Sequence, residues 1–92
     1  MTTTIPTTHF LSDKRPSLEE AQKLVGGYVQ MITLTNGSQM LVDEDGISKN
    51  LPFNLYASVQ AGDYAPIYGD VLILSGVARW VSREVDIWPH QI

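Results

Sequence analysis

Cysteine is absent from this chain of 92 residues. Its absence excludes disulfide bonds, thiolate catalysis and cysteine-ligated zinc, so packing or a partner subunit must stabilise the fold. A reducing compartment suits such a chain, and we expect a cytoplasmic protein. Long hydrophobic runs are missing as well, because no stretch is long enough for a membrane span or a signal peptide. We therefore expect no association with a membrane.

Basic residues are scarce. Six Lys and Arg stand against ten Asp and Glu, which gives a net charge of −4. Nucleic-acid binding depends on clustered basic side chains that displace counterions, and these six are scattered along the chain. The ten acids are also too sparse to imitate the phosphate row of DNA. We therefore expect no nucleic-acid partner.

No set of residues in the sequence has the pattern of a catalytic site. The two histidines, His9 and His90, lie near opposite ends of the chain, whereas general acid–base chemistry needs titratable groups in one cleft. The run Asp43–Gly46 lacks the spacing of an EF-hand and is more typical of a turn. Asp70 is the best single carboxylate, but capping the preceding turn is a simpler role for it. We expect no catalytic residue, no metal site and no cofactor.

The hydrophobic content of 43% is enough for one small core. Residues 1–16 are rich in threonine and contain two prolines, which predicts a flexible arm. Residues 17–92 are expected to form a single domain.

A short helix is predicted at the start of this domain. Ser17 and Glu20 have the spacing of a reciprocal cap, in which each side chain accepts a hydrogen bond from the other residue's backbone amide. The helix should cover residues 18–25 and end at Gly26 and Gly27. About two turns of helix cannot persist alone in water, so this helix must pack on a sheet.

Strands are predicted over residues 28–35, 39–43, 47–49 and 71–75. A two-residue hairpin turn at Asn36–Gly37 would place Ile32 opposite Leu41. Both faces of this hairpin carry apolar side chains, so one face should meet the helix and the other a second layer or another chain. This pattern predicts a homo-oligomer.

Turn residues divide the remainder of the chain. Gly46 is expected to adopt a left-handed conformation, and Asn54 to cap a short helix over residues 54–59 that ends at Gly62. The tail from Val77 fits either one face of a helix or an edge strand over residues 77–83, and the edge strand is favoured because Trp and Val suit a pleated surface. The fold class is therefore α+β, with a short N-terminal helix packed on a small antiparallel sheet, a hairpin meander plus a central strand at 71–75.

Aromatic residues gather around one loop that contains glycine and proline. Tyrosine rings make good anchors for a partner because they cover much area while only two torsions are fixed. The candidate partner-binding residues are Tyr56, Tyr64, Ile67 and Tyr68, with Trp80 and Trp88 in the tail. The simpler alternative is that these rings cover the core with their polar atoms in water.

Four segments resemble a known family in their order and spacing: Leu24–Val29, Val42–Gly46, Leu51–Ser58 and Ile67–Leu74. They are similar to a family of small phage and prophage proteins, catalogued as domain of unknown function three-eight-four-six. The resemblance covers about residues 17–75 and implies a viral or mobile-element origin. It implies no activity, so no site residue can be transferred from it.

These observations favour a binding module over an enzyme. We expect a phage-encoded accessory protein that associates non-catalytically with a host protein, for example as an inhibitor of a defence or metabolic system. The alternative is an oligomeric protein that sequesters a small molecule or nucleotide. There, Tyr64 or Tyr68 would stack on a base, and Arg79 or Arg83 would hold phosphates.

Overall fold

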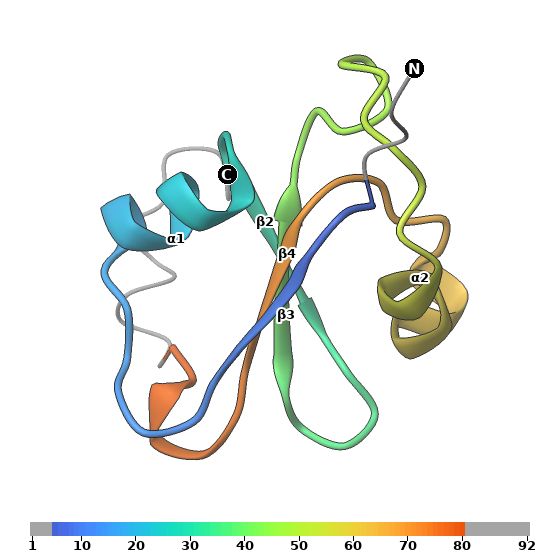
Figure 1. The fold of residues 1–92 in the computed structure, drawn as a ribbon. Coiled ribbons are helices and arrows are strands. Elements are labelled where there is room, and N and C mark those ends of the chain that lie inside the picture. The colour runs from blue at the N-terminus through green and yellow to red at the C-terminus, as the bar shows by residue number, and fades with distance from the viewer. Residues whose placement is uncertain (1–4, 81–92) are drawn as a thin grey trace.

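Figure 1 shows the computed structural model, which describes residues 5–80. The elements follow the order β1 (Thr8–Leu11), α1 (Leu18–Val25), β2 (Val29–Thr33), β3 (Gln39–Asp43), α2 (Leu55–Ala61) and β4 (Val71–Leu74). Two short 3₁₀ turns, η1 (Gly62–Tyr64) and η2 (Gly76–Ala78), follow α2 and β4. The α+β class is as the sequence predicts.

The four strands form one mixed sheet in the order β1-β4-β3-β2. β3 is antiparallel to both β2 and β4, whereas β1 runs parallel to β4. The prediction of a wholly antiparallel sheet is therefore wrong for the β1–β4 pair. β4 lies between two other strands, in the central position that its apolar sequence predicts.

The predicted flexible arm over residues 1–16 contains the parallel strand β1, so that prediction is wrong for Thr8–Leu11. Backbone hydrogen bonds join Val71 N to Thr7 O at 3.1 Å and Ser75 N to Leu11 O at 3.0 Å. Composition alone could not reveal this strand because its partner lies about sixty positions further along the chain.

Asp70 also contributes to the docking of β1. Its Oδ1 atom accepts a hydrogen bond of 2.8 Å from the backbone N–H of Thr7. Asp70 therefore satisfies an amide of a distant segment rather than of its own preceding turn.

The first helix has the predicted bounds and caps. Ser17 Oγ accepts from Glu20 N at 3.1 Å, and the Glu20 carboxylate accepts from Ser17 N at 2.9 Å. The hydrogen bond from the Ser17 backbone lowers the pKa of Glu20 below its ordinary value. Gly26 ends the helix with φ +94°, a conformation that glycine adopts without steric cost.

The β2–β3 hairpin reverses at Asn36–Gly37, but its loop has three residues instead of the predicted two. Leu34 N donates to Ser38 O at 2.8 Å, and Gly37 N donates to Leu34 O at 3.0 Å. Gly37 has φ +89°. In three-residue hairpin loops, a residue in this left-handed conformation follows a type I turn. Asn-Gly suits both loop lengths, so the dipeptide locates the reversal without fixing the register.

The longer loop shifts the register of the hairpin by one residue. Ile32 lies opposite Met40, not Leu41 as predicted. Successive side chains of a strand lie on opposite faces of the sheet. A shift of one residue therefore moves each β3 side chain to the other face relative to the side chains of β2. The two apolar faces of the hairpin are thus composed differently from the prediction, although both remain apolar.

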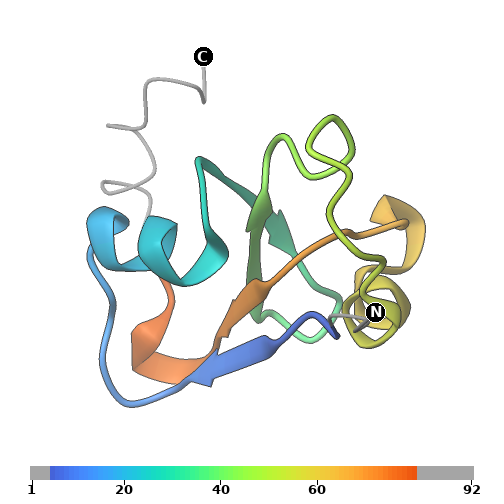
Figure 2. The same cartoon turned by 45° about the horizontal axis from the view of Figure 1, so that its top comes forward.

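Two apolar clusters lie on opposite faces of the sheet, each under one helix (Figures 1 and 2). The α1 face buries Ala21, Val25, Val29, Leu41, Leu72, Leu74, Ala78 and Trp80. The α2 face buries Ile32, Leu34, Met40, Val42, Ala57, Ala61, Ile67, Val71 and Ile73. Both faces of the hairpin are therefore covered within the chain. The hairpin therefore no longer supports the prediction of a homo-oligomer, which stays a prediction.

The connection from β3 to α2 is a series of turns. The predicted strand over residues 47–49 is wrong, because the backbone there closes local turns instead of pairing with a neighbouring strand. These turns are held by hydrogen bonds from Lys49 N to Asp45 O at 3.0 Å and from Leu51 N to Gly46 O at 3.1 Å.

Gly46 has a different role from the one predicted. The non-glycine residue with positive φ in this loop is Asn50, at +58°, and Gly46 is not among the glycines with positive φ. A Cβ atom at Gly46 would lie 3.1 Å from the carbonyl oxygen of Tyr68. The loop therefore requires glycine there because another backbone segment passes close by.

The second helix begins at the predicted cap. Asn54 Oδ1 accepts from Ala57 N at 3.0 Å, and Gly62 ends the helix with φ +58°. Leu55, in the first turn of this helix, is exposed. The predicted edge strand over 77–83 is wrong for residues 77–80, where η2 leads into an extended segment, and its remainder lies outside the described residues.

Candidate functional site

A groove of about 420 Å³ opens on the α2 side of the sheet. Its apolar floor consists of Ile32, Val42 and Ile67, which belong to the core beneath α2. The loop of residues 43–48 forms one wall, and residues 64–68 form the other, with Tyr64, Pro66 and Tyr68 among its lining residues. We call this site the tyrosine groove. Its volume lies in the range typical of ligand sites.

The loop wall is held by short polar contacts. Asp43 Oδ1 accepts from Asp45 N at 2.8 Å, and Gly46 N donates to Asp43 O at 3.2 Å. The hydroxyl of Ser48 donates to Asp45 O at 3.2 Å. Hydrogen bonds across the loop thus fix a wall that, beyond Asp43 at the end of β3, contains no helix or strand.

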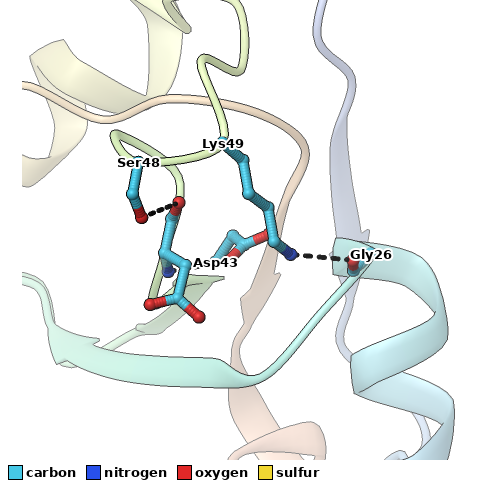
Figure 3. A network of polar contacts seen from close by, with 5 residues as sticks. Gly26, Asp43, Ser48 and Lys49 are labelled. Atoms are coloured by element: carbon cyan, nitrogen blue, oxygen red, sulfur yellow. Dashed lines mark hydrogen bonds and ion pairs between the residues drawn. The ribbon is translucent and has the colours of Figure 1, made fainter.

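Lys49 joins this wall by an ion pair to the end of β3 and by a hydrogen bond to the end of α1 (Figure 3). Lys49 Nζ lies 2.8 Å from Asp43 Oδ2, whose side chain is only 1% exposed. Lys49 also donates to the carbonyl oxygen of Gly26 at 3.4 Å, at the end of α1. The hydrogen bond with Asp43 raises the pKa of Lys49 above its ordinary value of 10.5. The charge of Asp43 is consequently compensated from outside the groove.

This ion pair predicts a dependence of stability on pH. A raised pKa means that protonated Lys49 stabilises the folded state, with the full contribution present below pH 10.5 and lost as pH rises through the folded-state pKa. Lys49→Met should lower the free energy of unfolding at neutral pH, because Asp43 then stays buried without its cation. The difference between variant and native protein should shrink at about pH 11.

Urea denaturation at both pH values measures this difference. Lys23→Met is a suitable control because Lys23 is an exposed residue of α1. Equal stability of native protein and Lys49→Met at neutral pH would contradict the structural role given to the pair.

The tyrosine wall is held by aromatic packing and by backbone contacts. The rings of Tyr68 and Phe53 pack edge to face, with centroids 5.8 Å apart and an interplanar angle of 68°. Their backbones form an isolated antiparallel bridge, and Gly69 N donates to Pro52 O at 2.7 Å. These contacts fix the orientation of the Tyr68 ring.

The same wall is attached to α2. Ile67 N donates to Ser58 Oγ at 2.8 Å, and Asn54 N donates to Ile67 O at 2.9 Å. Tyr64 stands at the end of η1, where the residue is 62% exposed. The groove therefore has a fixed inner part and an exposed ring at its rim.

The groove combines aromatic rings with acidic side chains. Asp43, Glu44 and Asp45 are among its lining residues, and no Lys, Arg or His of residues 5–80 lines it. Ile47, which is 70% exposed, adds an apolar side chain to the loop wall. Such groups can stack on a ligand, exclude water from it and pair with a cation.

Two further findings concern metal binding and membrane crossing. Over residues 5–80, no three His, Cys, Asp or Glu side chains lie close enough together to hold a metal ion. No helix in the same range has the length and apolar character required to cross a membrane.

Comparison with protein families gives a match over residues 3–85 to a family described as a domain of unknown function, DUF3846. The chain belongs to this family. The match extends the sequence resemblance over residues 17–75 toward both ends and takes in β1. Searches of curated proteins and of solved structures found no match. The tyrosine groove lies wholly within the DUF3846 region.

The DUF3846 fold brings together three of the predicted partner-binding residues. Tyr64, Ile67 and Tyr68 all line the groove, although Ile67 is buried and forms part of its floor. Tyr56 lies apart from them: it does not line the groove, and its ring packs edge to face on Phe10 of β1, with centroids 6.0 Å apart. The predicted tyrosine cluster is thus divided between two surfaces.

Trp80 is a core residue of this DUF3846 domain, so its predicted use as a partner anchor is wrong. Its side chain is buried on the α1 face, and its Nε1 atom donates to Pro16 O at 2.9 Å. Trp88 lies outside the described residues.

The residues of the nucleotide-binding alternative are not assembled. Arg79 lies at the hairpin, where its guanidinium donates to Gly37 O at 3.2 Å, and it does not line the groove with Tyr64 and Tyr68. Arg83 lies outside the described residues.

Sequence reasoning missed the loop wall of the site. Glu44 and Asp45 were assigned to a turn, and Ile47 to a strand. The available signal was Ile47 itself, because a large apolar residue in a polar turn has no local packing role. The pairing of this loop with residues 64–68 depends on the tertiary fold and has no local signal.

Proposed function

We propose that this protein is a small phage-encoded accessory protein that acts by non-catalytic association with a host protein. The observation that carries this proposal is the exposed ring of Tyr64 at the rim of a preformed groove. Rings in such positions are frequent anchors of protein interfaces.

The groove exposes apolar surface that the chain itself does not cover. Tyr64 and Ile47 both line the groove and are both well over half exposed. Contact with a partner would remove this surface from water and provide a favourable free energy of association. The apolar floor beneath them would continue the contact into the groove.

The walls of the groove also favour binding because they are already ordered. Local hydrogen bonds hold the acidic loop, and the Phe53–Tyr68 contact holds the second wall. A preorganised surface loses less conformational entropy on association than a flexible one does. Less of the favourable free energy of the ring contacts is therefore offset by the cost of ordering the walls.

The resemblance to phage and prophage proteins supports a phage origin and a site of action in the host cytoplasm. A protein of this size can inhibit a defence or metabolic protein by covering its working surface, without any reaction of its own. No specific observation favours the nucleotide-sequestering alternative, because Arg79 and the groove tyrosines lie in different places.

Affinity capture from host lysate tests this proposal. Tyr64→Ala should weaken partner capture by about 1–3 kcal/mol, as truncation of an interface anchor does, while the fold stays intact. Tyr56→Ala is the matched control, because Tyr56 is also an exposed tyrosine but lies outside the groove. Native mass spectrometry of the captured complex gives the partner mass and the subunit count.

Two results would contradict the proposal: capture that Tyr64→Ala leaves unchanged, or capture that Tyr56→Ala alone abolishes. Circular dichroism of both variants separates lost binding from lost folding.

A further inference from the structure

We infer that β1 joins two copies of this chain, which pair edge to edge around a two-fold axis. The surface involved lies outside the tyrosine groove, so the inference does not rest on the proposed function. It is carried by the free edge of β1 and by an uncharged apolar patch beside that edge.

The outer edge of β1 is open. β1 forms one edge of the sheet and pairs with β4, and no other strand of residues 5–80 pairs with it (Figure 2). The carbonyl oxygens of Thr7 and Leu11 accept hydrogen bonds from the β4 side. Backbone groups alternate in direction along a strand, so those of Thr8 and Phe10 point away from β4. Neither Lys nor Pro, which commonly protect such edges, occurs in β1.

An apolar patch lies beside this edge, on the α2 side of the sheet. The ring of Phe10, a residue that is 60% exposed, packs on Tyr56 with centroids 6.0 Å apart. Leu55 and Val59 continue the patch along α2, because residues three or four positions apart are neighbours on a helix surface. Both are about as exposed as Phe10. We call these four residues the α2 patch.

The α2 patch and the edge are free of strong charges. Neither α2 nor β1 contains an Asp, Glu, Lys or Arg residue. The net charge of −4 makes two copies repel each other, and this repulsion is weakest where neither copy presents an acid. Contact through the α2 patch would also remove apolar side chains from water. The distribution of charge therefore favours this surface for self-association.

A second copy matches the edge and the patch in one contact. Antiparallel pairing of β1 with its counterpart requires a two-fold axis perpendicular to the sheet, because only then do the two sheets continue each other. This axis keeps both α2 helices on the same face, so the two α2 patches lie side by side above the joined strands. A partner of another kind would need its own free edge and an apolar patch at the same spacing.

Sedimentation equilibrium of the full chain tests the association. We expect a monomer–dimer equilibrium in the micromolar range. Phe10→Glu and Val59→Glu should each raise the dissociation constant by about tenfold or more, because the contact would then bury unpaired charges. Val77→Glu is the matched control: Val77 is 67% exposed, but it lies in η2, outside the α2 patch. It adds the same charge and should leave the dissociation constant nearly unchanged.

Amide hydrogen exchange of the native chain separates strand pairing from contact through the patch alone. The amides of Thr8 and Phe10 should exchange more slowly at concentrations where the dimer predominates than in the dilute monomer. The amides of His9 and Leu11 face β4 and should slow less. Circular dichroism identifies any variant that has lost its fold, and the measurements on the native chain do not depend on the variants.

Four results would overturn the inference. They are a native chain that stays monomeric at millimolar concentration, a dimer that Phe10→Glu and Val59→Glu leave intact, equal losses with Val77→Glu, and exchange of Thr8 and Phe10 that does not change with concentration. Slow exchange of these two amides in a monomer, seen only when host lysate is present, would assign the edge to a strand of another protein. Capture of a host protein through Tyr64 is independent of all these results, so the dimer and the proposed function can fail separately.

Discussion

Trp80→Ala is expected to lower the free energy of unfolding by about 3–5 kcal/mol, the range for removal of a large buried aromatic side chain. Trp80 is only 4% exposed and belongs to the apolar cluster beneath α1. Its indole also holds the segment before α1, through the hydrogen bond to Pro16 O. The substitution would thus leave a cavity and an unsatisfied carbonyl together.

The backbone of Trp80 is fixed independently of its ring. Gln39 Oε1 accepts from Trp80 N at 2.6 Å, and Gln39 Nε2 donates to Trp80 O at 2.7 Å. These bonds use only main-chain atoms of residue 80, so they can persist in a variant. Trp80→Phe therefore isolates the indole contribution and should cost less than Trp80→Ala, because an aromatic ring still fills most of the space.

Chemical denaturation monitored by far-ultraviolet circular dichroism gives both values. A loss below about 1 kcal/mol for Trp80→Ala would be typical of a surface position and would show that Trp80 is not part of the core.

Deletion of residues 1–12 is expected to destabilise the protein by about 3 kcal/mol or more. It removes the hydrogen bonds that join Thr7 and Leu11 to β4 and its flanking residues, each with a net contribution of about 0.5–1.5 kcal/mol. It also removes Leu11, which packs against the α1-side core, and leaves an edge of β4 unpaired.

Deletion of residues 1–4 is the control, because β1 and its contacts with β4 begin only after that segment. Equal denaturation midpoints for the two truncated proteins would support the flexible arm that the sequence predicts and contradict the parallel strand.

Local signals in the sequence predicted local structure well. The Ser17–Glu20 pair and the Asn54 cap each specify a helix start with backbone and side-chain groups only three residues apart, and both are present as predicted. The position of the hairpin was likewise evident from Asn36–Gly37. Its register was not, because the three-residue loop and the two-residue loop both accept this dipeptide.

The wrong predictions concern interactions between distant segments. β1 is a short edge strand whose identity depends on pairing with β4, and its sequence has no clear alternation of polar and apolar residues. The segment 47–49 forms turns, and Lys49 in it pairs with the buried carboxylate of Asp43. Neither contact leaves a periodic pattern in the sequence.

The candidate site shows the same difference between local signals and contacts of distant segments. The aromatic loop was visible in the sequence, and Tyr64 and Tyr68 do lie in the groove. The acidic wall of the groove was not visible in the sequence, because residues 43–48 and 64–68 become neighbours only in the tertiary fold. Composition could not assign Trp80 either, since tryptophan is frequent both in cores and at interfaces.

Photo-crosslinking from the groove tests the central claim, that this groove is the partner-binding surface. A benzophenone side chain at position 47 should crosslink to the host partner, and the same group at position 59 should not. Ile47 and Val59 are exposed to similar extents, 70% and 66%, but only Ile47 lines the groove. Efficient crosslinking from position 59 with none from position 47 would contradict the account.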